Sequence, residues 1–205
     1  MKALLATPLH YGTADSEFIN GLLYAHGLYA GWVCFSGQAN ICLARDTLAA
    51  RFLDTDCTTL VFIDGDIGFG RQDLELLLNS PHPITCGLYQ RKNSSGGWVS
   101  HPQPEHALVD EHNPSLRRVE RAGTGFMRID REVFQTLVED RYVNSYLIGS
   151  KTINEFFPTG VFNGEFLTED YYFCELAKGA GYSIYADTRI RLAHAGRFIY
   201  QERLE

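Results

Sequence analysis

Apolar positions along the first 90 residues follow two spacings in turn, one typical of strands and one typical of helices. Short continuous apolar runs predict buried strands at 2–7, 32–36, 58–63 and 83–89. Apolar residues three and four positions apart predict helices at 16–31, 41–54 and 71–80. Because strand and helix alternate, this half predicts an α/β fold with a parallel sheet covered by helices on both faces.

The second half is less regular. Strands are predicted at 117–123, 125–129, 183–187 and 190–196, and helices at 130–140 and 169–182. Two long polar or aromatic connections, 90–118 and 141–167, interrupt the pattern. Connections of this length in a compact domain are often active-site loops. No internal repeat or linker is visible, so we expect one domain over 1–205.

Composition narrows the class of protein. The 205 residues are 45% hydrophobic and carry a net charge of −7, which argues against nucleic acid as the main partner. The longest apolar runs are short pieces such as LVFI, so no membrane span is expected. The first ten residues do not resemble a secretory signal, and the five cysteines are odd in number and scattered. These features together favour a cytoplasmic, reducing location.

The most informative segment is LVFIDGDIGF. A buried strand that ends in Asp64-Gly65-Asp66 places two carboxylates at the carboxyl end of a parallel sheet, where open α/β sheets bind ligands. Oxygen ligands suit Mg²⁺ or Mn²⁺, which in turn suit diphosphate oxygens. The same three residues would also make an ordinary turn.

His194 follows a short apolar run far along the chain. It would complete a site with two carboxylates, and an imidazole ligand favours Mn²⁺ over Mg²⁺. Alternatively it is a surface or packed histidine. Glu169 and Asp170 open a predicted helix behind Thr168, where they either complement the helix dipole or supply a general base.

Glycines and cations give weaker signals. Gly123-Thr124-Gly125 lies between two predicted strands and indicates either close approach to a ligand or a bulge. Arg45, Arg91 and Lys92 stand where they would meet phosphate charge or simply solvent. The sequence contains no P-loop, no dinucleotide fingerprint after the first strand and no serine-hydrolase elbow.

Taken in order, these segments resemble the GT-A-fold glycosyltransferases of the nucleotide-diphospho-sugar transferase superfamily, in particular the small family-2-like domains of bacteria and viruses. The matching pieces run from residue 5 to residue 196: ATP, LARDTLAARFL, LVFIDGDIGF, CGLYQRK, GTGFMRIDREVF, TEDYYFCELAKGAGYSIYAD and LAHAG. The resemblance implies a Rossmann-like αβα sandwich with a mostly parallel sheet and a smaller C-terminal β element. It also implies a donor-binding half at about 1–90 and an acceptor half at about 91–205.

The resemblance implies roles for single residues. Asp64 and Asp66 would form the D-x-D motif that holds Mn²⁺ or Mg²⁺, with His194 as a further ligand. Asp170 would be the catalytic base of an inverting enzyme, and Glu169 an acceptor contact or substitute base. The remaining matches would contact the donor (Thr7, Pro8, Arg45, Asp64 and Gly65) or line the acceptor side (Gly123, Thr124 and Gly125).

The implied substrates are a nucleoside-diphosphate-sugar and a glycan or other hydroxyl acceptor. A UDP-sugar is favoured, although FSGQAN lacks the acidic residue that often reads uracil. Three alternatives remain open: a retaining transferase of the same fold, a non-catalytic nucleotide-sugar-binding module, and a phosphatase of the haloacid-dehalogenase type. In the phosphatase Asp64 would be the nucleophile, but that motif normally sits on the first strand.

Overall fold

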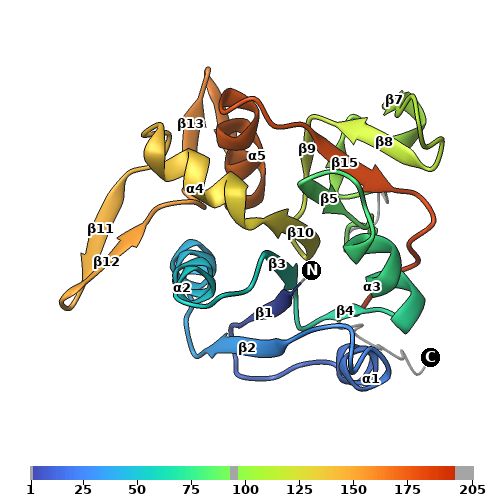
Figure 1. Cartoon of the computed structure of the whole chain (residues 1–205), viewed down its shortest axis with the longest axis horizontal. Coiled ribbons are helices and arrows are strands. Elements are labelled where there is room, and N and C mark those ends of the chain that lie inside the picture. The colour runs from blue at the N-terminus through green and yellow to red at the C-terminus, as the bar shows by residue number, and fades with distance from the viewer. Residues whose placement is uncertain (1, 93–96, 197–205) are drawn as a thin grey trace, which may run out of the picture.

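The computed structural model describes residues 2–92 and 97–196, which form one mixed sheet between two layers of helices (Figure 1). The helices are α1 (Ser16–Tyr24), α2 (Ile41–Leu53), α3 (Arg71–Leu78), α4 (Arg131–Glu139), α5 (Glu169–Gly179) and a short 3-10 helix, η1 (Pro104–His106). The strands of the main sheet are β1 (Ala3–Leu9), β2 (Gly31–Ser36), β3 (Thr59–Ile63), β5 (Ile84–Cys86), β7 (Leu108–Val109), β8 (Leu116–Val119), β10 (Phe126–Asp130) and β15 (Ile184–Asp187).

The eight strands of this sheet lie in the order β2-β1-β3-β10-β5-β15-β8-β7. β1 pairs in parallel with β2 and β3, and β5 pairs in parallel with β15. β10 runs antiparallel between β3 and β5, and β8 runs antiparallel between β15 and β7. Six of the eight strands therefore point the same way, which confirms the mostly parallel sheet.

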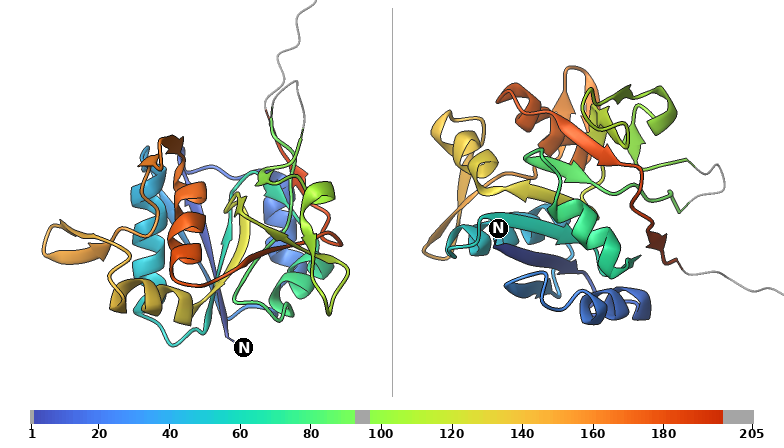
Figure 2. Two further views of the ribbon diagram at one scale, coloured as in Figure 1. Left: turned by 90° about the horizontal axis from the view of Figure 1, so that it is seen from above. Right: turned by 45° about the vertical axis from the view of Figure 1, so that its right-hand side comes forward.

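Helices cover both faces of the sheet, as predicted (Figure 2). α2, α4 and α5 pack on one face, and α1 and α3 pack on the other. β3 shows why an uninterrupted apolar run is needed at the centre of such a sheet. Leu60 and Phe62 point into one core, whereas Val61 and Ile63 point into the other, and all four are fully buried.

The first helix is shorter than predicted. α1 ends at Tyr24, and a turn over 25–28 leads to β2 instead of a helix that continues to residue 31. Gly27 in this turn has a φ of +90°, a conformation that ends a right-handed helix. The apolar spacing of Leu28 and Tyr29 continues past this point because both still pack against the α1 core.

The predicted connection at 141–167 holds two antiparallel hairpins. β11 (Ser145–Ile148) pairs with β12 (Lys151–Asn154), and β13 (Gly160–Phe162) pairs with β14 (Glu165–Leu167). Asn163-Gly164 forms the turn of the second hairpin with φ of 49° and 86°. An Asn-Gly pair is the usual sequence signal for such a turn, because both residues tolerate a positive φ. This segment was predicted only as a long connection, and its two hairpins were not identified.

The other long connection is also partly structured, and residues 93–96 of it lie outside the described residues. It contains β6 (Ser100–His101), which pairs with β9 (Arg121–Ala122), as well as η1 and β7. The predicted strand at 117–123 is divided between β8 and β9. Among the described helices, none is long and apolar enough to cross a membrane.

A small ladder places the end of the chain beside the D-x-D segment. β16 (Ala193–His194) pairs antiparallel with β4 (Ile67–Gly68), with His194 opposite Ile67. The predicted strand at 190–196 is thus reduced to two residues. Because β4 begins directly after Asp66, this pairing brings His194 to the carboxyl end of β3.

Candidate functional site

A cleft of about 770 Å³ opens at the carboxyl ends of β1 and β3. This is the edge at which open α/β sheets bind ligands. Its lining comes from the end of β1, the loop before α1, the loop after β2, the D-x-D segment and the chain after β16: Pro8, Leu9, His10, Tyr11, Thr13, Ala14, Asp15, Gln38, Ala39, Ile41, Asp64, Gly65, Asp66, Lys92, Ala195 and Gly196.

Asp66 lies at the mouth of this cleft, next to Lys92 and His194. Its Oδ2 forms an ion pair with the Lys92 ammonium and lies 3.8 Å from His194 Nε2. The backbone N–H of Ala195 donates to the Asp66 carbonyl at 2.8 Å, which fixes the chain on either side. The structure therefore brings together Asp66 and His194, which are 128 positions apart in the sequence and were predicted to share a site.

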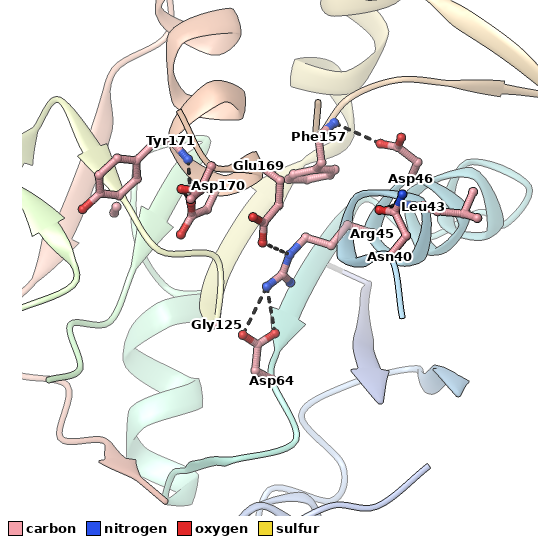
Figure 3. A network of polar contacts seen from close by, with 12 residues as sticks. Asn40, Leu43, Arg45, Asp46, Asp64, Gly125, Phe157, Glu169, Asp170 and Tyr171 are labelled. Atoms are coloured by element: carbon pink, nitrogen blue, oxygen red, sulfur yellow. Dashed lines mark hydrogen bonds and ion pairs between the residues drawn. The ribbon is translucent and has the colours of Figure 1, made fainter. Parts of the chain in front are cut away.

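Asp64 faces inward instead. Arg45, on α2, donates through Nη2 to both Asp64 oxygens at 3.0 and 3.1 Å and through Nε to Glu169 at 3.4 Å (Figure 3). The Arg45 side chain is 4% exposed, and its Nη1 has no hydrogen-bond partner among the described residues. The Asp64 carboxylate is thus already matched by a buried cation.

Burial and charge act against each other in this group. Burial alone would lower the pKa of Arg45, but the Asp64 and Glu169 carboxylates raise it. Burial raises the pKa of Asp64, and the Arg45 guanidinium opposes that shift. Arg45 therefore remains charged and holds Asp64 and Glu169 in place. The expected contact between Arg45 and a donor stays a prediction.

Asp170 lies beside this group, in the first turn of α5. Its Oδ1 accepts hydrogen bonds from the Thr168 hydroxyl and from the Tyr171 N–H, while Oδ2 accepts none from the part of the chain that the structure describes. Burial, followed by the charge of Glu169, raises the pKa of Asp170. One oxygen of a half-buried carboxylate is thus available, with its basicity increased, as a general base requires.

The glycines at 123 and 125 have a packing reason. A Cβ on Gly123 would come within 2.3 Å of the Tyr89 hydroxyl, and one on Gly125 would come within 2.6 Å of it. The Gly125 N–H donates to that hydroxyl at 3.0 Å, and its carbonyl accepts from the Asp64 N–H at 2.9 Å. Thr124 between them is fully buried. The glycines therefore seat Tyr89 behind Asp64, and their acceptor role stays a prediction.

Thr7 and Pro8, at the end of β1, lie differently with respect to the cleft, and their contact with a donor stays a prediction. Pro8 lines the cleft, whereas Thr7 is fully buried and its hydroxyl accepts from the Trp32 indole at 2.9 Å. Gly65 lines the cleft where a Cβ would come within 2.6 Å of the Leu9 side chain.

Sequence reasoning missed Tyr89, Asp15 and Gln38 as parts of this region. The rule that selected Asp64 also applies to Tyr89, because Tyr89 is the last residue of the fourth predicted strand, 83–89, and follows the observed end of β5 at Cys86. Asp15 and Gln38 lie in loops that follow the first two strands and line the cleft. No residue pattern marks them locally.

The donor chemistry of the cleft fits a divalent cation. His194 Nδ1 donates to the Gln90 carbonyl at 2.6 Å, so Nε2 is the ring nitrogen that faces Asp66 and is placed to bind a metal. Asp66 and His194 thus offer one carboxylate and one imidazole, and no cluster of three or more acidic, His or Cys side chains able to hold a metal occurs within 2–92 and 97–196. Mg²⁺ and Mn²⁺ sites of this kind take further oxygens from a phosphorylated substrate.

Comparisons with known proteins bear on the fold. No protein-family model matches the sequence, and no curated protein matches it. The chain is similar to the crystal structure of A197 from STIV, with a TM-score of 0.58 and 18% identity over 100% of this chain and 99% of that one. It is also similar to the crystal structure of GalNAc-T7 with UDP, GalNAc and Mn²⁺, with a TM-score of 0.52 and 11% identity over 96% of this chain and 44% of that one.

At these identities the likeness is one of fold. The chain has an α/β fold of the Rossmann-like GT-A type, with a large mixed sheet covered on both faces. Fold alone does not assign a reaction. The functional argument therefore rests on the cleft and its side chains.

Proposed function

We propose that this protein transfers a sugar from a nucleoside-diphosphate-sugar, with a UDP-sugar favoured, to an acceptor hydroxyl with inversion. The observation that carries the proposal is the meeting of Asp66 and His194 at the mouth of a cleft beyond the parallel strands. A hard cation beside such a cleft suits a diphosphate, and GalNAc-T7, which shares the fold, was crystallised with UDP and Mn²⁺.

The cleft offers places for the parts of the donor. Tyr11 lines it with 78% of its surface exposed, and its ring is held edge-on against His10 at 4.1 Å. We assign Tyr11 to the face of the nucleobase and the Pro8–Gly65 region to the nucleoside. The diphosphate then lies near Asp66 and Lys92, and the sugar lies toward Asp170.

Asp66 and His194 would hold Mn²⁺ or Mg²⁺. The bound cation would supply Lewis-acid stabilisation of the charge on the diphosphate leaving group. Asp170 Oδ2 takes the proton of the acceptor hydroxyl while that oxygen bonds to the anomeric carbon and the bond to the diphosphate oxygen breaks. Glu169 is held by Arg45, so we assign it to positioning and not to proton transfer.

The first test is calorimetric titration of UDP, GDP and TDP, each with Mn²⁺ and with EDTA. We expect one nucleotide to bind in the presence of Mn²⁺ and to bind much more weakly in EDTA. Asp66→Ala should lose the Mn²⁺-dependent part of the nucleotide affinity. Asp56→Ala, which removes an exposed carboxylate that pairs with Lys2, should keep it. Absence of binding for all three nucleotides under both conditions would refute the proposal.

Inversion has its own test. The anomeric configuration of the product, read by NMR after incubation with the donor identified above, separates the two mechanisms. Inversion is expected if Asp170 activates the acceptor. Retention would leave the donor assignment intact and remove the role of Asp170 as base.

A further inference from the structure

Lys92 lines the described part of the cleft, and the proposed function places the donor diphosphate near it without explaining its ion pair with Asp66. It follows β5, and its ammonium forms an ion pair with Asp66 Oδ2. The two side chains are 37% and 39% exposed, so the pair sits at the mouth of the cleft and not in the core. The carboxylate expected to hold a divalent cation therefore already holds a monovalent one.

The same carboxylate oxygen faces a second donor. Asp66 Oδ2 lies 3.8 Å from His194 Nε2, the ring nitrogen that the hydrogen bond from His194 Nδ1 to the Gln90 carbonyl leaves facing the cleft. A divalent cation between them would be bound by the Asp66 carboxylate and by Nε2 of the neutral imidazole. In this structure Lys92 supplies the positive charge beside Asp66.

Lys92 is built into this place. Gly196 lies against its side chain, so that a Cβ at residue 196 would come within 3.4 Å of Lys92 Cδ. The neighbouring residue Gln90, which fixes His194, forms an isolated bridge with Trp98. Residues 90–92 thus both fix His194, through the Gln90 carbonyl, and carry Lys92, and both side chains lie beside Asp66 Oδ2.

The charges nearby favour a further cation. Among the described residues, five carboxylates and two Lys or Arg side chains lie in or beside the cleft: Asp15, Asp64, Asp66, Glu169, Asp170, Arg45 and Lys92. If Lys92 leaves Asp66, that carboxylate is unpaired. A divalent ion on Asp66 and His194 would restore the balance and free the ammonium.

We propose that Lys92 and a divalent cation compete for Asp66, and that the displaced ammonium binds the diphosphate of the donor. Only the binding of the diphosphate by Lys92 rests on the proposed function; the competition for Asp66 does not. Lys92 would then have two roles: it pairs with Asp66 before the metal binds, and it contributes positive charge to the leaving group once the metal has bound.

The test measures Mn²⁺ binding to the free protein by electron paramagnetic resonance, without nucleotide. Since an exposed ion pair is weak, we expect Lys92→Met to tighten Mn²⁺ binding by roughly two- to fivefold. Lys92→Arg, which keeps the charge, should stay close to wild type. Lys2→Met removes a similar exposed Lys–Asp pair at the opposite edge of the sheet and should change nothing.

Asp66→Ala should abolish the Mn²⁺ binding that Lys92→Met enhances. Equal affinity in wild type and Lys92→Met, or failure of both to bind Mn²⁺, would overturn the competition. Circular dichroism would confirm that each variant is folded.

A second measurement separates this inference from the proposed function. In saturating Mn²⁺, Lys92→Met should bind UDP several-fold more weakly than wild type, because the ammonium no longer reaches the phosphates. Tighter Mn²⁺ binding without any UDP binding would support the competition and refute the nucleotide-sugar assignment. Unchanged UDP affinity would refute the role of Lys92 in diphosphate binding.

Discussion

Arg45 organises the inner part of the site at the scale of single residues. Its guanidinium is buried beneath the Phe62 ring, 5.4 Å from the ring centre, and it pairs with Asp64 and Glu169. Asp64 and Glu169 lie 19 and 124 positions from Arg45 in the sequence. Each would be costly to bury without this cation.

Arg45→Met should therefore destabilise the protein, because it leaves Asp64 and Glu169 without their counter-charge. We expect the free energy of unfolding at pH 7 to fall by about 3 kcal/mol. Urea unfolding measures this change. Arg51→Met, an exposed arginine of the same helix, is the matched control, with an expected loss below about 1 kcal/mol. Equal losses in the two variants would contradict the assignment.

Asp170→Asn should lower turnover by about 10²–10⁴-fold, because it removes a positioned base. UDP affinity in Mn²⁺ should be unchanged, because the substitution leaves the donor cleft intact. Steady-state kinetics and calorimetry measure the two quantities. Asp140→Asn, at the distant end of α4, is the control and should keep its turnover. Wild-type turnover in Asp170→Asn would exclude the residue as base.

The pH profile gives an independent check on Asp170. Burial raises its pKa above the usual value for Asp, which is about 4. Activity should therefore be lost as the pH falls through this raised pKa. An acid limb at or below the ordinary value would contradict the burial of the base.

At the scale of elements, the β11–β12 hairpin is tied to α2 through Asp46. This carboxylate is 1% exposed and accepts hydrogen bonds from the Tyr146 hydroxyl and from the Phe157 N–H, both at 2.9 Å. Burial raises the pKa of Asp46 to about 7, although both hydrogen bonds oppose the shift. The attachment of the hairpin is therefore sensitive to pH.

The sign of this effect is fixed by linkage. Between pH of about 4 and 7 the folded state keeps the Asp46 proton that the unfolded state releases, so stability falls as the pH rises through this range. Asp46→Asn removes this contribution. Its stability relative to wild type should increase from pH 5 to pH 7.5 in urea unfolding. Tyr146→Phe removes a hydrogen bond that lowers the pKa of Asp46. In this variant the pH range over which stability falls should therefore extend to higher pH. A constant difference between Asp46→Asn and wild type would contradict the shift.

At the scale of the whole molecule, one sheet joins the two halves of the chain. β10 comes from the second half but lies between β3 and β5 of the first half. β15, from the far end of the sequence, extends β5 in parallel. The predicted donor half at 1–90 and acceptor half at 91–205 are therefore not separable folding units, and their functional roles stay predictions.

We therefore expect one cooperative thermal transition. Scanning calorimetry should give equal calorimetric and van't Hoff enthalpies, of roughly 140 kcal/mol near 60 °C for a chain of this length. A fragment of residues 1–90 should show no cooperative unfolding, because β3 and β5 lose the strand between them. Two resolved transitions in the intact protein would contradict this arrangement.

Much of the fold was predictable because local patterns report burial. The helix predicted at 41–54 is α2 at Ile41–Leu53, and the run at 58–63 is β3. The hairpins of 141–167 were missed, even though Asn163-Gly164 marked one of them. The antiparallel direction of β10 leaves no local trace, because its apolar run reads the same in either direction.

The sequence by itself determined the alternation of strands and helices over the first 90 residues and the edge of the sheet at which Asp64 and Asp66 lie, because periodic apolar residues specify which faces are buried. Tertiary structure decided the ion pairs that the sequence did not indicate: Arg45 with Asp64 and Glu169, and Lys92 with Asp66. These pairs join residues up to 124 positions apart, and no spacing along the chain encodes them. The Arg45 pairs form because packing buries these side chains, and a buried charge is stable only beside its counter-charge.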